Sequence, residues 1–177
     1  MSDGRRGAPP ALPGQLGGAF NLVDHHGRTV SDETHRGRFM LLFFGFTRCR
    51  AVCPRALSRL SRVIDRLGPA ASRLQPLYVT VDPDRDTSEV MKAFLEKDYP
   101  HFTGLTGPRE NIDHVKSLYR VFAKRAADPD DAAGYQMPHT AFTYLIGPDG
   151  RYMAHFTDAV EEDELVNRLR EYLCDSG

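Results

Sequence analysis

The hydrophobic positions of the chain change their spacing several times, and each spacing predicts a different element. A nearly continuous apolar run over 39–46 is typical of a central strand that is buried on both faces. A second strand is predicted over 77–81, which is rich in β-branched and aromatic residues. The clearest hairpin is predicted over 141–156, where two apolar runs flank the turn 147–150.

Apolar residues three and four positions apart predict four helices. They run over about 51–67, from Asp86 onward, from Pro108 to Phe122, and over about 160–173. We expect Asp86 and Glu89 to form a capping box at the start of the second helix. The first helix has a second, basic face, which we interpret as solvated because an aspartate interrupts it. That face consists of Arg55, Arg59, Arg62 and Arg66.

The order of these elements predicts the fold class. A small hairpin over 19–30 comes first, and its turn contains His25 and His26, which we interpret as solvated surface residues. A short strand over 102–107 precedes the third helix. The resulting βαβ half and ββα half predict an α/β, thioredoxin-like fold with a central mixed sheet flanked by helices and an extra N-terminal β-hairpin. We assign 18–177 to one thioredoxin-like domain and 1–17 to a flexible Gly/Pro-rich arm.

Composition narrows the classes of function. The chain has 177 residues, of which 41% are hydrophobic and 27% charged, as expected of one compact domain. Its formal net charge of -1 gives no electrostatic case for binding nucleic acid or an anionic membrane. Crossing a bilayer takes about 18 consecutive apolar residues. No run in this sequence approaches that length, so we expect no transmembrane segment, and the N-terminal stretch lacks the apolar region of a secretory signal.

Two of the three cysteines, Cys49 and Cys53, follow the central strand at the predicted start of a helix; Cys174 is the third. A helix N-terminus lowers the pKa of a thiol and stabilises the thiolate. Residues four apart on a helix lie roughly 6 Å apart, which allows a disulfide or a shared soft metal ion. The residues leave three interpretations open: a redox dithiol, a metal site with one further ligand, and two buried core cysteines.

His139 is the candidate third ligand. It lies just before the strand that opens the predicted 141–156 hairpin, and Pro138 precedes it. In a thioredoxin arrangement the loop that enters this strand faces the helix that carries the cysteines. Two thiolates and an imidazole suit copper, because thiolate selects Cu(I) and imidazole accepts either oxidation state.

Several ordered blocks then resemble one family. The segment 45–54 is similar to the Cys-x-x-x-Cys-Pro signature of the Sco/SenC family, the copper chaperones of cytochrome c oxidase assembly. The segments 79–87, 102–107 and 135–150 resemble further blocks of that family in the same order. The resemblance implies a thioredoxin fold and copper, as Cu(I) or Cu(II), bound by Cys49, Cys53 and His139.

The resemblance also implies partners and a location. It implies copper delivery to, or thiol reduction of, the dinuclear copper site of cytochrome c oxidase subunit II, or service to another copper-accepting protein. A copper donor or a thiol-reductant protein would act upstream. Family members generally act on the exported side, periplasmic or membrane-associated; the chain shows no signal or anchor, so a cytoplasmic location stays open.

Two departures from the family pattern keep alternatives open. Arg48, Arg50 and Ala51 stand where the family often has other residues around the cysteines, and Pro138 replaces an aspartate before the histidine. The arginines favour thiolate and oppose an incoming cation, but they also suit a net-negative Cu(I) bis-thiolate. The alternatives are a thiol–disulfide oxidoreductase or peroxiredoxin-like enzyme that uses Cys49 and Cys53, and a non-catalytic interaction domain.

Overall fold

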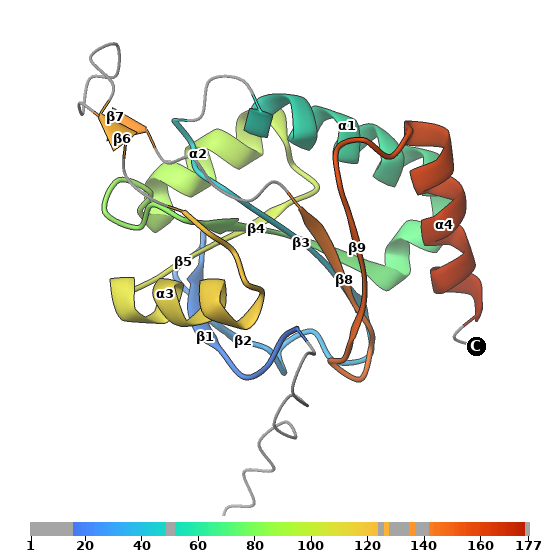
Figure 1. The fold of residues 1–177 in the computed structure, drawn as a ribbon, viewed down its shortest axis with the longest axis horizontal. Coiled ribbons are helices and arrows are strands. Elements are labelled where there is room, and N and C mark those ends of the chain that lie inside the picture. Colours follow the sequence, from blue (N-terminus) through green and yellow to red (C-terminus); the bar gives the residue numbers. More distant parts are fainter. Residues whose placement is uncertain (1–15, 49–51, 124–125, 128–134, 137–141, 176–177) are drawn as a thin grey trace, which may run out of the picture.

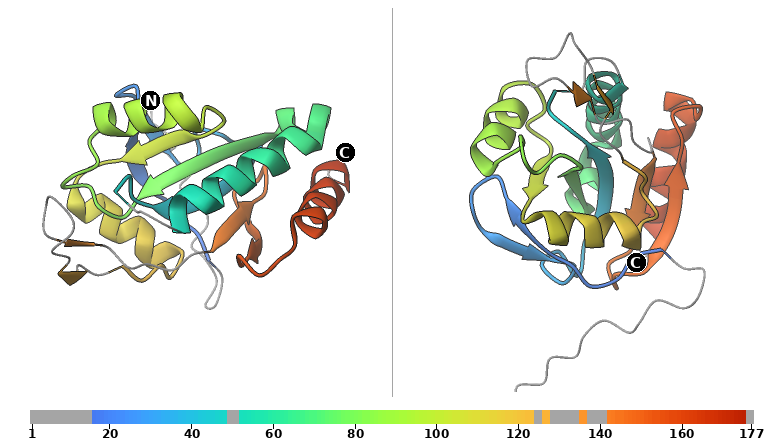
Figure 2. Two further views of the ribbon diagram at one scale, coloured as in Figure 1. Left: turned by 90° about the horizontal axis from the view of Figure 1, so that it is seen from above. Right: turned by 60° about the vertical axis from the view of Figure 1, so that its left-hand side comes forward.

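The computed structural model describes residues 16–48, 52–123, 126–127, 135–136 and 142–175. Within these ranges, helices cover both faces of one seven-stranded sheet (Figure 1, Figure 2). The strand order is β2-β1-β5-β4-β3-β8-β9. A separate two-stranded sheet pairs β6 (Ala126–Ala127) with β7 (Tyr135–Gln136).

The middle of the sheet follows the predicted pattern. Parallel pairing joins β3 (Phe39–Gly45) to β4 (Leu74–Thr80), and β4 to β5 (Thr103–Thr106). All seven residues of β3 are buried, as its continuous apolar run predicts. On the other side of β3, the hairpin of β8 (Thr143–Ile146) and β9 (Tyr152–Phe156) pairs antiparallel.

The N-terminal hairpin extends the same sheet. Its strands are β1 (Asn21–Asp24) and β2 (Thr29–Ser31), and β1 also pairs antiparallel with β5. The predicted extra hairpin is therefore confirmed, and it lengthens the sheet beyond β5. The predicted arm, 1–17, lies almost entirely outside the described residues and stays a prediction.

Two apolar clusters lie on opposite faces of the sheet. The first receives side chains from α1 (Val52–Leu67), α2 (Ser88–Asp98) and α4 (Glu162–Asp175), and the second receives them from α3 (Arg109–Leu118). Figure 1 shows α3 on the side of the sheet away from α1 and α2. A 3-10 helix, η1 (Gly68–Arg73), follows α1, and Gly68 leaves α1 with a φ of +59° that suits glycine. The fold is the predicted thioredoxin-like arrangement.

Two predictions about helix ends are wrong. The helix after Pro108 ends at Leu118, because Arg120 takes a φ of 53° and turns the chain out of the helix. Phe122 therefore lies beyond the helix and is 70% exposed. The cap of α2 is Thr87, whose side chain accepts from the Val90 backbone N–H, and Asp86 is engaged elsewhere.

The second core strand is also longer than predicted, since β4 begins at Leu74 and not at Leu77. Within the described ranges, no helix has both the length and the apolar character needed to cross a bilayer.

Candidate functional site

The structure describes the framework around the predicted site. Cys49 and His139 lie outside the described residues, and so does the side chain of Cys53, whose backbone belongs to the first turn of α1. The residues that lead into and out of these segments form the described part of the site.

The strands that precede the cysteines and follow the histidine are neighbours. In the antiparallel pair of β3 and β8, Phe43 lies directly opposite Thr143. Phe43 is close to the end of β3, and Thr143 is the first residue of β8. The chain therefore leaves β3 and enters β8 at the same end of this strand pair.

A buried carboxylate fixes the chain just after β3. Asp86 is 1% exposed, and it accepts hydrogen bonds from the Thr47 backbone N–H at 3.0 Å and the Thr47 hydroxyl at 2.6 Å. The Thr80 hydroxyl donates to the same carboxylate at 2.7 Å, and the Thr106 hydroxyl donates to the Asp86 carbonyl at 2.7 Å. Asp86 thus connects the chain after β3 with the last residues of β4 and β5.

Burial raises the pKa of Asp86, and the hydrogen bonds from Thr47 and Thr80 oppose that rise. A second buried carboxylate, Asp82, forms an ion pair with Arg85 in the same loop. The loop after β4 is therefore held by buried, charge-assisted hydrogen bonds, which resist rearrangement.

Sequence reasoning missed the role of Asp86 and assigned it to a helix cap. A signal was available, because Thr80 and Thr106 are the last residues of two adjacent parallel strands, and Thr47 comes just after a third. Hydroxyls gathered at one sheet edge require a shared acceptor when they are buried.

The start of α1 suits anionic groups. The first turn of α1 contains no acidic residue, so the positive end of the helix dipole has no carboxylate of its own to offset it there. Cys53 lies in this turn. An anionic group is favoured over a neutral one at a helix start of this kind.

In the basic face of α1, Arg55, Arg62 and Arg66 are exposed, as predicted, whereas Arg59 is half-buried, and the face also binds α4. Arg62 and Arg66 form ion pairs with Glu162, and Arg66 forms a further one with Asp163 at 2.7 Å. Arg59 donates to the carbonyls of Asp158 and Val160 in the segment before α4. Much of this face therefore holds α4 and the chain leading into it.

A second group of possible metal ligands, His25, His26 and Glu96, has ligand atoms within 4.8 Å of one another. His25 is buried, which contradicts the predicted solvated position, whereas His26 is exposed as expected. The Gly104 backbone N–H donates to His25 Nδ1 at 2.9 Å. A neutral imidazole that accepts at Nδ1 carries its proton on Nε2, and a protonated nitrogen does not bind a metal. This hydrogen bond gives His25 a structural role and opposes a metal site here.

Fold and framework together define a thioredoxin-like protein in which the central strand is followed by a helix whose first turn contains Cys53, with Cys49 four residues earlier in the sequence. The sequence profile of the SCO1/SenC family matches residues 8–174. The chain belongs to this family.

Solved and curated relatives agree with that assignment. The chain is 36% identical over 156 residues to an SCO2-like protein of Rickettsia prowazekii, covering 88% of this chain and 76% of the relative. Copper-bound ScoI of Bradyrhizobium japonicum superposes with a TM-score of 0.80 at 38% identity, covering 89% of this chain and 99% of that one. Copper-bound yeast Sco1 gives a TM-score of 0.82 at 30% identity, covering 92% and 90%.

Proposed function

We propose that the chain binds one copper ion through the thiolates of Cys49 and Cys53 and the imidazole of His139. It then passes the copper to the dinuclear copper site of cytochrome c oxidase subunit II or to another copper-accepting protein. Membership of the SCO1/SenC family supports this role, and so do the two copper-bound relatives.

One structural observation carries the proposal: the register of β3 with β8. Cys49 follows Phe43 by six residues, and His139 precedes Thr143 by four, while Phe43 and Thr143 lie opposite each other. An extended chain spans at most about 3.5 Å per residue, and connections this short allow both segments to reach the same end of the β3–β8 pair. A site shared by the two segments is therefore within reach.

The ligand set suits copper as cargo. Thiolates are soft ligands that favour Cu(I), and an imidazole retains affinity when the copper is Cu(II). The start of α1 favours the deprotonated thiols that such a site requires. Together the residues provide a site that holds copper in either oxidation state.

Anaerobic Cu(I) titration and Cu(II) titration, followed by sulfur-to-copper charge transfer, test the site. We expect one equivalent on the wild type and a loss of about tenfold or more in affinity in Cys49→Ser, Cys53→Ser and His139→Ala. Cys174→Ser is the matched thiol control, because Cys174 is an exposed free cysteine on α4. Unchanged binding in His139→Ala would contradict the ligand set.

A thiol–disulfide reductase is the second candidate, favoured by the same helix start. The reduced pair would pass two electrons to a partner disulfide and become a Cys49–Cys53 disulfide itself. A reduction potential near -270 mV, about that of thioredoxin, with turnover of insulin would favour this role. The absence of turnover with any disulfide partner would remove it.

The location and the upstream partner belong to the same proposal. Delivery to oxidase subunit II requires the chain to act on the exported side, supplied by a copper donor or a thiol-reductant protein. Fractionation of cells that express the protein tests this, and a purely cytoplasmic signal would contradict it.

A further inference from the structure

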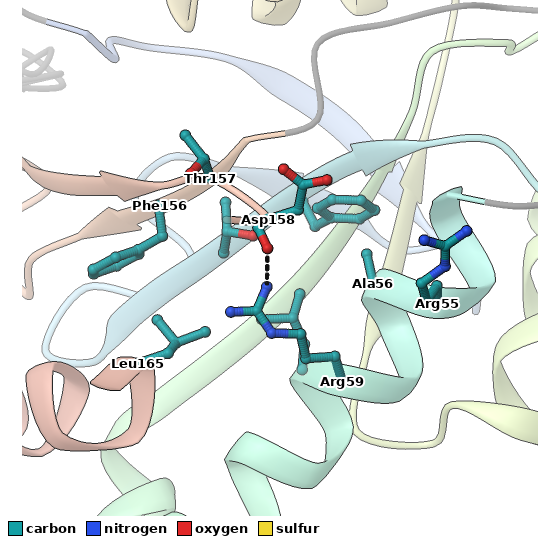
Figure 3. Close-up of a pocket in the computed structure, with 10 residues that line it drawn as sticks. Arg55, Ala56, Arg59, Phe156, Thr157, Asp158 and Leu165 are labelled. Atoms are coloured by element: carbon teal, nitrogen blue, oxygen red, sulfur yellow. Dashed lines mark hydrogen bonds between the residues drawn. The ribbon is translucent and has the colours of Figure 1, made fainter. Parts of the chain in front are cut away.

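A cavity of about 140 Å³ opens between the first turns of α1 and the β8–β9 hairpin (Figure 3). Its walls are largely apolar, and Arg55, Arg59 and Asp158 also line it. An apolar cavity of about 150 Å³ accommodates one benzene molecule. This cavity therefore has room for a single bulky apolar side chain.

The sheet register explains why the cavity exists. Phe43 lies opposite Thr143, and Thr143 lies opposite Phe156, so the three side chains share one face of the sheet. The small Thr143 leaves space between two phenylalanines. Ala56 of α1 also lines the cavity and adds little volume. The space is open because residues from two elements are small there.

The cavity mouth carries more positive than negative charge. Arg55 is exposed, and among the described residues it forms no hydrogen bond or ion pair. The Arg59 guanidinium donates to two backbone carbonyls, and within the described ranges it forms no ion pair with a carboxylate. Among the described residues that line the cavity, only Asp158 carries a carboxylate. An apolar side chain that enters here is best accompanied by an acidic neighbour.

Residues that line the cavity are also close in sequence to the proposed copper ligands. Arg55 and Ala56 follow Cys53 by two and three residues on α1, and Thr143 follows His139 by four. A protein that takes copper from Cys49 and Cys53 has to approach this edge of the sheet. Its surface would then cover the cavity.

We propose that this cavity is a docking pocket for the copper-accepting protein. It seats one bulky apolar side chain of that protein, and an adjacent acidic residue of the same protein pairs with Arg55. The inference rests on the proposed function, because it names the acceptor as the occupant. It adds the contacts through which the acceptor is recognised.

The test uses the full chain loaded with copper and the apo soluble domain of cytochrome c oxidase subunit II as the acceptor. Initial rates of copper transfer are measured against acceptor concentration. Ala56→Leu fills the pocket, and Arg55→Glu reverses the charge at its mouth. Arg151→Glu, in the turn at the far end of the β8–β9 hairpin, makes the same charge change away from the pocket.

We expect Ala56→Leu and Arg55→Glu each to raise the half-saturating acceptor concentration about tenfold. For Ala56→Leu, tenfold corresponds to the lower end of the free energy gained by burying one large apolar side chain. Arg151→Glu should leave it unchanged, and the Arg55→Glu effect should shrink as salt is raised. Because Arg55 is exposed, its variant keeps the test decisive if Ala56→Leu does not fold.

Three results would overturn the pocket. The first is a half-saturating acceptor concentration that is the same in both variants as in the wild type. The second is a loss of copper loading in the variants that accounts for their slower transfer. The third is self-association of the wild type that both variants abolish. The wild type separately decides the proposed function: if it does not bind or transfer copper, the proposed function fails and the pocket falls with it.

Discussion

The side chain of Asp86 shows how one residue organises a site without being a ligand of it. Its carboxylate gathers an amide and two hydroxyls from segments 39 and 6 residues away in the chain. Thr47, which provides two of these donors, lies two residues before Cys49 in the sequence. Asp86 thus sets where the chain turns toward the cysteines.

Thr47→Val should destabilise the protein by about 2 kcal/mol, because a buried carboxylate loses a hydroxyl donor that the isosteric side chain cannot replace. Thr47→Ser keeps the hydroxyl and should cost less than half as much. Urea denaturation of both variants measures the difference. Equal losses would show that the methyl group, and not the hydrogen bond to Asp86, stabilises this turn.

His25 gives the stability a pH dependence. Burial, and then the neighbouring His26, lower the pKa of His25 below its ordinary value of 6.5. As pH falls through 6.5, His25 binds a proton in the unfolded chain before it does so in the folded protein. The stability that neutral His25 contributes is therefore complete above pH 6.5 and is lost as pH falls toward the lowered pKa. His25→Asn keeps an acceptor for the Gly104 N–H and should flatten this dependence in denaturation curves between pH 5 and 6.5. The same slope in wild type and variant would exclude His25 as the cause.

At the scale of single residues, the sequence identifies features that depend on residues close together in the chain. The four-residue spacing of Cys49 and Cys53 is visible without a structure. The roles of Asp86 and His25 are not, because their partners Thr47 and Gly104 lie 39 and 79 residues away. Aspartate before a helix and histidine in a turn match common local motifs, and tertiary contacts override both.

Among the elements, α1 is joined through Arg59 to the segment that leads into α4. Arg59→Met keeps the apolar stem and removes the guanidinium, so we expect a loss of about 1.5–3 kcal/mol from its hydrogen bonds to carbonyls. Arg55→Met on the same helix is the matched control and should stay within about 0.5 kcal/mol of the wild type. Thermal or urea unfolding measures the stability of both variants, and equal losses of stability would contradict a specific role for Arg59.

Close packing of α2 on β5 depends on Gly104. A Cβ at this position would lie 2.8 Å from Leu95 Cδ1 and 2.9 Å from Met91 Cε, and both side chains are fully buried. Gly104→Ala should therefore destabilise the protein by about 1–3 kcal/mol through overpacking. Gly107→Ala, whose Cβ would meet Leu22 Cδ2 at an ordinary 3.5 Å, is the control. Similar unfolding midpoints for the two variants would show that α2 can shift to make room.

Element types follow from periodicity more reliably than their ends do. The buried run of β3 and the apolar face of α1 are fixed by residues within each element. The end of α3 is not, because Phe122 continues the apolar spacing while the backbone of Arg120 has already left the helix. Nothing local distinguishes that Phe from one on a helix.

For the whole molecule, the proposed copper site couples binding to stability. A ligand present at 100 times its Kd stabilises the folded state by about 2.7 kcal/mol if it binds only that state. Copper should therefore raise the unfolding temperature of the wild type, and a Cu(I) chelator should reverse the rise. Cys49→Ser should show a clearly smaller rise, and an equal rise in that variant would point to binding elsewhere.

The N-terminal hairpin changes which strand forms one edge of the sheet. Without β1, the next strand outward would be β5, whose last three residues are buried. With the hairpin in place, the edge passes to β2, which has only three residues. Short edge strands give another chain little to pair with. A chain that lost β1 and β2 would expose β5 as an unpaired, otherwise buried edge strand, so the hairpin also protects the protein against aggregation.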